Sequence, residues 1–315
     1  MNRAGSTALS LLSAPLNVDI LRTLEKEPLG PVELRRTVGF PPQSTMRVYI
    51  RTLAELGVLE RRRQNEFPGS VDYVLSKGGS ALLEVARVLE VWLQDAPDGE
   101  IELGTTSAKT AVKALVEGWS TNIVRALSAR SLTLTELNRL IPSVSYPSLE
   151  RRLTAMRLRG LAQRTPGNGR GSPYAASPWL RRAVVPLGAA MAWERRHAPG
   201  ATGAIGRLDV EATFLLAVPL LDLGPQANGR CRLAVELQGG SSPVFAGVSL
   251  NIEGGRVVSC VSRLDGDAEA WVGGTPIAWF GRMDGSEEGE LEMGGDTTLA
   301  SSVTDALRGA ATAPA

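Results

Sequence analysis

The sequence predicts an α+β protein in which two tandem copies of one helix-rich segment precede a smaller α+β domain. Three observations predict it: an internal repeat, a hairpin-like stretch late in each copy, and a change to strand-like patterning after residue 206. At an offset of 103 residues, apolar positions recur without a gap from Leu12 and Leu115 to Val58 and Leu161. A gapless repeat over about fifty positions fixes the spacing of its elements, so we interpret each copy as one folded domain.

The first copy covers residues 1–95 and begins with three predicted helices. Apolar residues at helical spacing place the first two over residues 8–26 and 32–39. After a Pro-Pro turn, Gln43 or Ser44 caps the third helix. That helix has three inward apolar positions, at Met46, Ile50 and Leu53.

A β-hairpin follows the third helix. Gly57 ends the helix, and strands over residues 58–63 and 71–75 flank a polar tip. A long amphipathic helix over residues 79–93 completes the copy. This order of elements predicts a winged helix-turn-helix domain.

The second copy covers residues 109–197 and repeats that order. Its predicted elements are helices over residues 112–127 and 133–140, a third helix that opens at Ser145, a hairpin over residues 161–174 and a terminal helix. Trp92 and Trp193, near the ends of the two terminal helices, lie 101 residues apart. The second copy is therefore two residues shorter after its third helix, and we place the shortening in the hairpin tip.

Linkers and a domain of different character complete the chain. Residues 96–108 form an acidic, polar linker, residues 198–206 a flexible one, and residues 309–315 a disordered tail. Residues 207–308 read as an α+β domain with a mainly antiparallel sheet. Its predicted strands cover residues 231–237, 244–252, 257–262, 269–272 and 289–293, and its helices residues 275–280 and 296–307. Residues 212–218 read as a further strand, in a hairpin with 231–237, or as a short helix.

Charge is divided unevenly along the chain. Residues 1–200 contain 27 Lys and Arg against 18 Asp and Glu, a net charge of +9, whereas residues 201–315 contain 7 against 15, a net charge of −8. Arginine supplies 30 of the 34 cations, and its planar fork suits phosphates and guanine edges. A genome rich in arginine codons explains that excess equally well. The asymmetry favours a polyanionic partner for the two copies and not for the last domain.

Each copy offers polar and cationic side chains to double-stranded DNA. A third helix in the major groove and a hairpin against the phosphates would place them at the interface. In the first copy the candidates are Gln43, Ser44, Thr45, Arg47, Arg51, Arg61, Arg62 and Arg63. In the second they are Ser145, Tyr146, Ser148, Arg151, Arg152, Arg164 and Arg170. The alternative is that all of them are ordinary solvated side chains.

One position breaks the symmetry of the two copies. Glu150 stands where Arg47 stands in the first copy. A carboxylate accepts a hydrogen bond from cytosine N4 but repels phosphate. We therefore expect the second copy to bind DNA less tightly.

Residues suited to catalysis or metal binding are scarce. The one histidine, His197, is expected at the surface, and no Cys/His cluster has zinc spacing. Cys231 and Cys260 are expected to be free thiols, with a disulfide between neighbouring strands as the alternative. No signal peptide and no apolar run of membrane-spanning length is recognised. The sequence predicts a cytoplasmic protein that is not an enzyme and has no catalytic residues, metal site or cofactor.

Both copies resemble the HxlR-like winged-helix regulators, within the broader MarR-like group. In the first copy the resemblance rests on Ile20-Leu21-Arg22-Thr23-Leu24, Glu33-Leu34 and residues 51–61. In the second it rests on residues 118–124, Glu136-Leu137, residues 149–153 and 160–164, Pro186 and Trp193. It covers residues 1–196 and implies DNA-binding transcriptional regulators that act as homodimers. A fused pair would then be a covalent pseudo-dimer, either monomeric or as a homodimer. Redox-sensing members use a cysteine in the DNA-binding domain, and none precedes Cys231 here.

Residues 207–308 resemble a sterol carrier protein-type domain. The resemblance rests on Trp271-Val272-Gly273-Gly274, a short helix, and residues 289–296 leading into the last helix. That fold commonly encloses an apolar tunnel, so the resemblance implies a hydrophobic small-molecule effector. The candidate ligand-binding residues are Phe245, Trp271, Trp279 and Phe280. The alternative is that these aromatic side chains are plain core.

These features predict a transcriptional regulator whose tandem winged helices bind an imperfect inverted repeat. An apolar ligand in the last domain would change the angle between that acidic domain and the basic pair, and thereby DNA affinity. Two alternatives stay open: a protein that sequesters a small molecule with the winged helices as scaffold, and a winged-helix module that binds other proteins.

Overall fold

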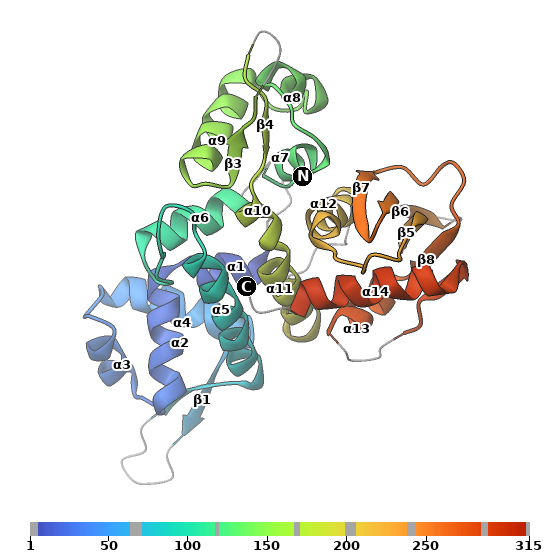
Figure 1. Cartoon of the computed structure of the whole chain (residues 1–315). Coiled ribbons are helices and arrows are strands. Elements are labelled where there is room, and N and C mark those ends of the chain that lie inside the picture. The colour runs from blue at the N-terminus through green and yellow to red at the C-terminus, as the bar shows by residue number, and fades with distance from the viewer. Residues whose placement is uncertain are drawn as a thin grey trace. The chain divides into compact units, whose positions relative to one another are not determined.

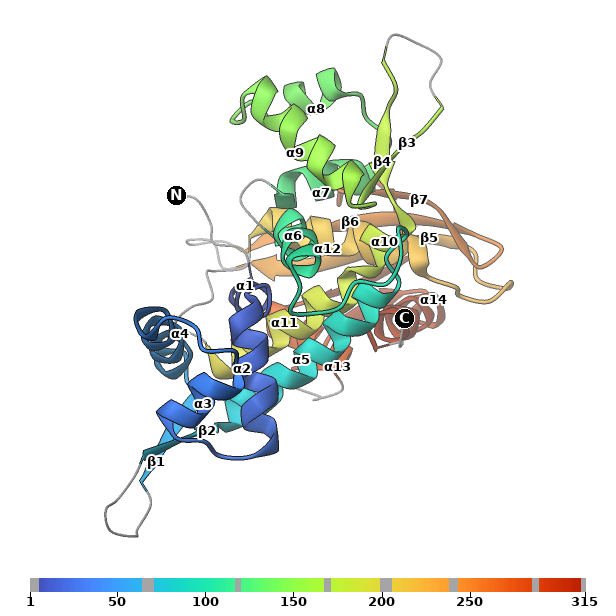
Figure 2. The ribbon, with the colours of Figure 1, turned by 90° about the vertical axis from the view of Figure 1, so that its left-hand side faces the viewer.

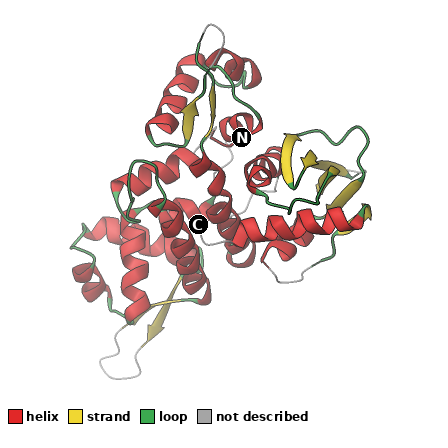
Figure 3. Cartoon of the chain, viewed as in Figure 1, coloured by secondary structure: helices red, strands yellow, loops and turns green. Residues whose placement is uncertain are grey.

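The computed structural model of the chain describes residues 6–63, 71–116, 120–166, 171–198, 206–237, 243–284 and 289–312 (Figure 1). Helices and strands are mixed throughout, and the strands form three sheets (Figure 3). The chain divides into two compact units, which are described separately. Unit 1 combines residues 1–116 with 186–203, and unit 2 combines residues 117–185 with 204–315.

Unit 1 contains the three helices and hairpin predicted for the first copy, here called the first head (residues 15–75). Its elements are α2 (Pro15–Lys26), α3 (Pro31–Thr37), α4 (Gln43–Glu55), β1 (Leu59–Arg63) and β2 (Val71–Leu75). The expected single helix over residues 8–26 is wrong, because it is two helices, α1 (Thr7–Leu12) and α2. Pro15 opens α2 in its first turn, where the missing N–H leaves no hydrogen bond unmade.

Four further helices, which precede or follow the heads in the sequence, complete unit 1. They are α1, α5 (Lys77–Gln94), α6 (Thr106–Val116) and α11 (Val184–His197). The carboxylate of Glu194 in α11 accepts hydrogen bonds from the Ser6 hydroxyl (2.6 Å) and the Ala8 N–H (2.9 Å) at the start of α1. The indole N–H of Trp193 donates to the Gly78 carbonyl at the start of α5 (2.8 Å). His197 is half-buried at the end of α11, with its ring centroid 6.0 Å from that of Trp193.

The compact units do not follow the predicted boundary of the second domain at residues 109–197. Helices α6 and α11 belong to that stretch of sequence, yet they lie in unit 1. Their apolar faces are buried there, as at Val112 and Trp193. The linker over residues 96–108 is also ordered, since Leu103 is buried and the Ile101 N–H donates to the Leu93 carbonyl (3.2 Å).

Unit 2 begins with the second head (residues 120–176). Its elements are α7 (Ser120–Ala129), α8 (Leu134–Leu140), α9 (Tyr146–Leu158), β3 (Ala162–Arg164) and β4 (Tyr174–Ala176), and α10 (Pro178–Arg182) follows. The expected helix over residues 112–127 falls on α6 and α7, and residues 117–119 between them lie outside the described residues.

Backbone hydrogen bonds at the end of the third helix correspond in the two heads. After the third helix, the Val58 N–H donates to Leu53 (2.8 Å) and, in the second head, Leu161 donates to Met156 (2.9 Å). Both helices end at a glycine with positive φ, 68° at Gly57 and 70° at Gly160. In the hairpins, Arg61 pairs with Tyr73 and Arg164 with Tyr174. Because the offset is 103 residues at the arginines and 101 at the tyrosines, the two-residue shortening lies between the hairpin strands, as predicted.

A five-stranded sheet domain forms the rest of unit 2. Its elements are α12 (Arg207–Ala217), a 3₁₀ turn (Val218–Leu220), β5 (Gly229–Leu237), β6 (Val244–Glu253), β7 (Arg256–Val261), β8 (Ala270–Gly274), α13 (Pro276–Asp284), β9 (Glu292–Gly295) and α14 (Thr297–Thr312). The strand order is β7-β6-β5-β8-β9. Only the β5–β8 pair is parallel, so the sheet is mainly antiparallel, as predicted.

Two details of this domain differ from the prediction. Residues 212–218 form helix and 3₁₀ turn, which confirms the helix alternative and shows that the hairpin with residues 231–237 is wrong. Almost every residue from Val210 to Val218 is buried, because α12 packs against both β6 and α7. Asp209 accepts the Gly206 N–H at the start of the helix (2.8 Å). Helix α14 continues to Thr312, so residues 309–312 of the expected disordered tail are helical.

Helices α12, α13 and α14 cover one face of the sheet (Figures 1 and 2). Along β5, Cys231, Leu233 and Val235 are buried, whereas Arg232 is only half-buried and Glu236 is exposed. Successive side chains of a strand point to opposite faces, so the buried set faces the helices. The other face carries the partly exposed side chains.

The two cysteines are free, as predicted, and the disulfide alternative is wrong. Cys231 on β5 pairs with Leu250 on β6, and Leu250 pairs with Cys260 on β7, so one strand separates the thiols. Two strand spacings put the Cα atoms about 10 Å apart, beyond the reach of a disulfide. Burial raises the pKa of each thiol to about 12.

The two heads differ in how the second helix begins. In α8 the Thr133 hydroxyl accepts the Glu136 N–H (3.3 Å) and the Glu136 carboxylate accepts the Thr133 N–H (2.8 Å), a capping box. These hydrogen bonds from Thr133 lower the pKa of Glu136. The equivalent of Thr133 in the first head is Gly30, which has no side chain to cap α3.

Substituting the cap residue of each head by that of the other is expected to change the free energy of unfolding in opposite directions. Gly30→Thr should raise the free energy of unfolding by about 0.5–1 kcal/mol, because it adds a cap and restricts the unfolded chain. A Cβ at Gly30 has room, since its nearest neighbour would lie 3.7 Å away. Thr133→Gly should lower the free energy of unfolding by about the same amount. Urea unfolding measures both, and a shift of the same sign for the two variants would contradict the assignment.

The native thiols are expected to be unreactive toward a thiol-specific reagent at pH 8. With a pKa of about 12, roughly one thiol in ten thousand is ionised at that pH, and burial restricts access further. Both cysteines should react after unfolding in guanidinium chloride. Rapid titration of either thiol in the folded protein would show that the sheet domain is packed differently.

Candidate nucleic-acid interface

A tight turn leads from α3 into α4 in the first head. Gly39 and Phe40 have positive φ values of 86° and 54°, and Phe40 is the one non-glycine residue with positive φ among the described residues. The Arg35 guanidinium lies 5.9 Å from the centroid of the Phe40 ring, and its Nε donates to the Pro41 carbonyl (2.8 Å). These contacts hold the turn that sets the direction of α4.

Helix α4 separates an apolar face from a polar face. Met46, Ile50 and Leu53 are buried, as predicted. The outward side chains are exposed at Gln43, Ser44, Arg47 and Arg51, and half-buried at Thr45. Neither Gln43 nor Ser44 caps the helix, because Pro42 holds the N-cap position and no side chain accepts a hydrogen bond there.

The hairpin of the first head carries Arg61, Arg62 and Arg63, all exposed on β1. The Arg61 guanidinium lies 5.8 Å from the centroid of the Tyr73 ring on β2, a cation–π contact that restrains it. Because side chains alternate along a strand, Arg61 and Arg63 share one face and Arg62 points to the other. The three arginines therefore do not form one patch, which the sequence prediction treated as a single group.

The second head places its candidates in the same way. Leu149, Leu153 and Met156 are buried in α9, and Ser145, Tyr146 and Arg151 are exposed. Ser148 and Arg152 are half-buried, and the Ser145 hydroxyl donates to the Ser148 hydroxyl (3.0 Å). In the hairpin, Arg164 lies 5.6 Å from the centroid of the Tyr174 ring, which repeats the Arg61–Tyr73 contact. Arg170 lies outside the described residues.

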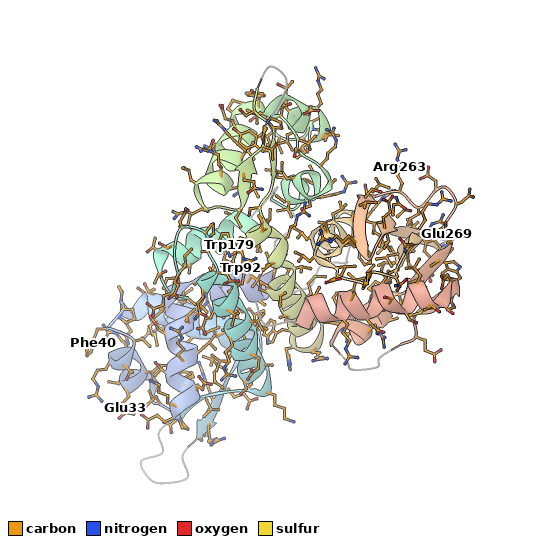
Figure 4. The ribbon with its side chains drawn as sticks, in the orientation of Figure 1. Glu33, Phe40, Trp92, Trp179, Arg263 and Glu269 are labelled. Atoms are coloured by element: carbon orange, nitrogen blue, oxygen red, sulfur yellow. The ribbon has the colours of Figure 1, made fainter. Side chains whose placement is uncertain are left out.

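Exposed apolar side chains join this surface and were not predicted. Phe40 is 61% exposed and projects from the turn before α4 (Figure 4). Val48, on the outward face of α4, is 50% exposed. The Gly-Phe-Pro-Pro sequence signals a turn, but it does not reveal that a bulky residue takes a left-handed conformation there. Such strain in an exposed aromatic residue is typical of functional surfaces.

The four candidate ligand-binding residues of the sheet domain do not line one cavity. Phe245 and Trp271 are 46% and 39% exposed on the face away from the helices. Trp271 lies over the neighbouring strand, where a Cβ at Gly294 would be 2.3 Å from its Nε1. Trp279 and Phe280 are on α13, and Trp279 is buried, donates to the Ala234 carbonyl (2.8 Å) and packs edge-on against Phe214.

A buried ion cluster joins the second head to the sheet domain within unit 2. Glu211 of α12 is 1% exposed and forms ion pairs with Arg125 of α7 and with Arg207, the latter at 2.7 Å. Arg125 also donates to the Ser262 hydroxyl at the end of β7 (3.2 Å). Arg181 of α10 bridges the same boundary, donating to the carbonyls of Leu215 (2.9 Å) and Ser128 (3.3 Å), and burial lowers its pKa.

The described ranges contain neither a candidate metal site nor a candidate membrane-spanning helix. Within them, no group of three or more His, Cys, Asp or Glu residues is placed to hold a metal ion. None of the described helices is long and apolar enough to cross a membrane.

Similarity to known proteins falls in the region of the first head. Residues 12–99 match the family model of the HxlR-like helix-turn-helix. Among solved structures, one described as a transcriptional regulator of the MarR family from Enterococcus faecalis V583 is 26% identical over 27% of this chain and 77% of that chain, with a TM-score of 0.26. No curated protein matches the chain. The family match spans the first head and α5.

Removing the charge of Glu211 is expected to destabilise unit 2. Glu211→Gln should lower the free energy of unfolding by about 1–2 kcal/mol, mainly because Arg125, which is 32% exposed, loses its charged and buried partner. Glu236, exposed on β5, provides a control, and Glu236→Gln should change stability by less than about 0.5 kcal/mol. Equal effects of the two substitutions in thermal or urea unfolding would mean that the cluster does not hold the second head to the sheet domain.

Proposed function

We propose that this chain is a transcriptional regulator that binds double-stranded DNA through two winged-helix heads. One observation carries the proposal: each head buries the apolar side of its third helix and turns the opposite side, with a cationic hairpin beside it, to solvent. A helix so presented fits a major groove, and arginines of a hairpin reach phosphates or the minor groove. The HxlR-like match of residues 12–99 supports the first head directly.

The second head is proposed to bind as an equivalent of the first. Its support is internal: second and third helices of equal length at the same offset, the same hydrogen bonds after the third helix, and the same Arg–Tyr pair in the hairpin. The set of helices in unit 1 favours a covalent pseudo-dimer, because α1 and α5 of the first copy belong to the same compact unit as α6 and α11 of the second copy. Glu194 and Trp193 tie these helices together.

The sheet domain, residues 207–308, is proposed to bind a hydrophobic effector. The resemblance to sterol carrier protein-type domains supports this role. Since Glu211 and Arg181 join this domain to α7 and α10, an effector that shifts α12 would act on the second head through those contacts. We propose this route in place of a change in the angle between the acidic sheet domain and both heads. An effector works this way only when it binds the two arrangements with different affinity, and unchanged DNA affinity at saturating ligand would contradict it.

DNA binding is expected to be strongly salt-dependent and to require Arg47. The full chain should bind a duplex from upstream of its own gene, with the logarithm of affinity falling linearly as the logarithm of salt concentration rises. Arg47→Glu should weaken binding at least about tenfold, because it removes a base or phosphate contact and adds repulsion.

A matched control separates this contact from the general charge of the protein. Arg263 is exposed in the sheet domain (Figure 4), and Arg263→Glu changes the net charge by the same amount. It should leave affinity within about twofold of the wild type, since the residue lies outside both heads. If the protein bound an apolar ligand tightly but did not bind DNA, a sequestering function would be favoured instead. If it bound neither DNA nor an apolar ligand, a protein-interaction module would be favoured.

A further inference from the structure

The two heads place opposite charges at one equivalent position. Helices α4 and α9 have the same length, and Arg47 and Glu150 each follow directly after the first buried residue, Met46 or Leu149. Because the helix ends and the hairpin registers also correspond, both side chains point in the same direction relative to their own head.

Both side chains are available to a partner. Arg47 and Glu150 are exposed, and neither forms an ion pair or hydrogen bond with any residue in the described part of the chain. Each lies in the second turn of its helix, within the N-terminal part that contacts base edges in helix-turn-helix complexes. By contrast, Arg51 already pairs with Glu55 (3.7 Å).

Arginine and glutamate select different bases in the major groove. Guanine presents two acceptors, N7 and O6, which an arginine fork contacts with two hydrogen bonds. Cytosine presents the N4 amino donor, which a carboxylate accepts, whereas a carboxylate facing guanine meets only acceptors. One good pairing of this kind discriminates against the wrong base by roughly 5- to 150-fold.

We propose that this protein reads an asymmetric operator, with guanine facing Arg47 in one half-site and cytosine facing Glu150 at the equivalent position of the other. This rests on the proposed function. The remaining outward positions strengthen it, because Gln43 corresponds to Tyr146 and Val48 to Arg151. Two identical half-sites therefore leave one head mismatched. A homodimer binds a palindrome equally in both orientations, whereas this single chain binds its operator in one orientation only.

The test is an in vitro selection from a randomised duplex library with the full chain and with Glu150→Arg. The wild type should enrich two unequal half-sites, one with cytosine where the other has guanine. Glu150→Arg should change that cytosine to guanine and leave the other half-site unchanged. The variant should bind the wild-type sequence roughly 5- to 150-fold more weakly than the sequence with the single base-pair exchange.

A control variant shows whether an added positive charge alone changes the selected sequence. Glu236→Arg, on the exposed face of β5, adds the same charge outside both heads and should enrich the wild-type motif. A perfect palindrome for the wild type would overturn the proposal. So would a Glu150→Arg variant that binds all sequences more tightly with an unchanged motif, since Glu150 would then act only by repelling phosphate. Enrichment of no motif by any variant would instead reject the DNA-binding function itself.

Discussion

The burial of three apolar residues on one side of each third helix is the constraint on which the account depends. Met46, Ile50 and Leu53 are at most 6% exposed, and so are Leu149, Leu153 and Met156. At helical spacing these residues leave no rotational freedom, because turning the helix would bring polar side chains into the core. The orientation of every outward residue, including Arg47 and Glu150, follows from that packing. Glycines with positive φ then end both helices and start the hairpins in the same register.

The two heads belong to different compact units and have different neighbouring elements. The first head lies in a unit with flanking helices from both copies, in which Glu194 accepts two hydrogen bonds at the start of α1. The second head shares a unit with the sheet domain, to which Glu211 and Arg181 attach it. The two heads therefore have similar third helices and hairpins but different structural connections. The contacts of Glu211 and Arg181 connect the sheet domain directly to the second head.

The sequence predicted the order of elements in both heads and most of the last sheet, because periodicity and glycine or proline signals are local. It did not predict features that depend on tertiary packing. A continuous apolar pattern concealed the break before Pro15, and the choice between strand and helix for residues 212–218 stayed open until Phe214 was seen to pack against Trp279 in a helix. Outward residues of α4 and α9 were predictable from the helical period. The alternation of Arg61 and Arg62 across the hairpin, the left-handed Phe40 and the Glu211 cluster required coordinates, since each depends on contacts between segments.

The central claim is that both heads bind one DNA molecule. Its most direct test is hydroxyl-radical footprinting of the full chain on a duplex to which the protein binds. The account predicts two protected patches on the same face of the duplex, separated by about one helical turn or a multiple of it. Arg47→Glu should weaken protection in one patch first. A single protected patch, insensitive to substitutions in one of the two heads, would contradict the claim that the repeat is a pair of DNA-binding surfaces.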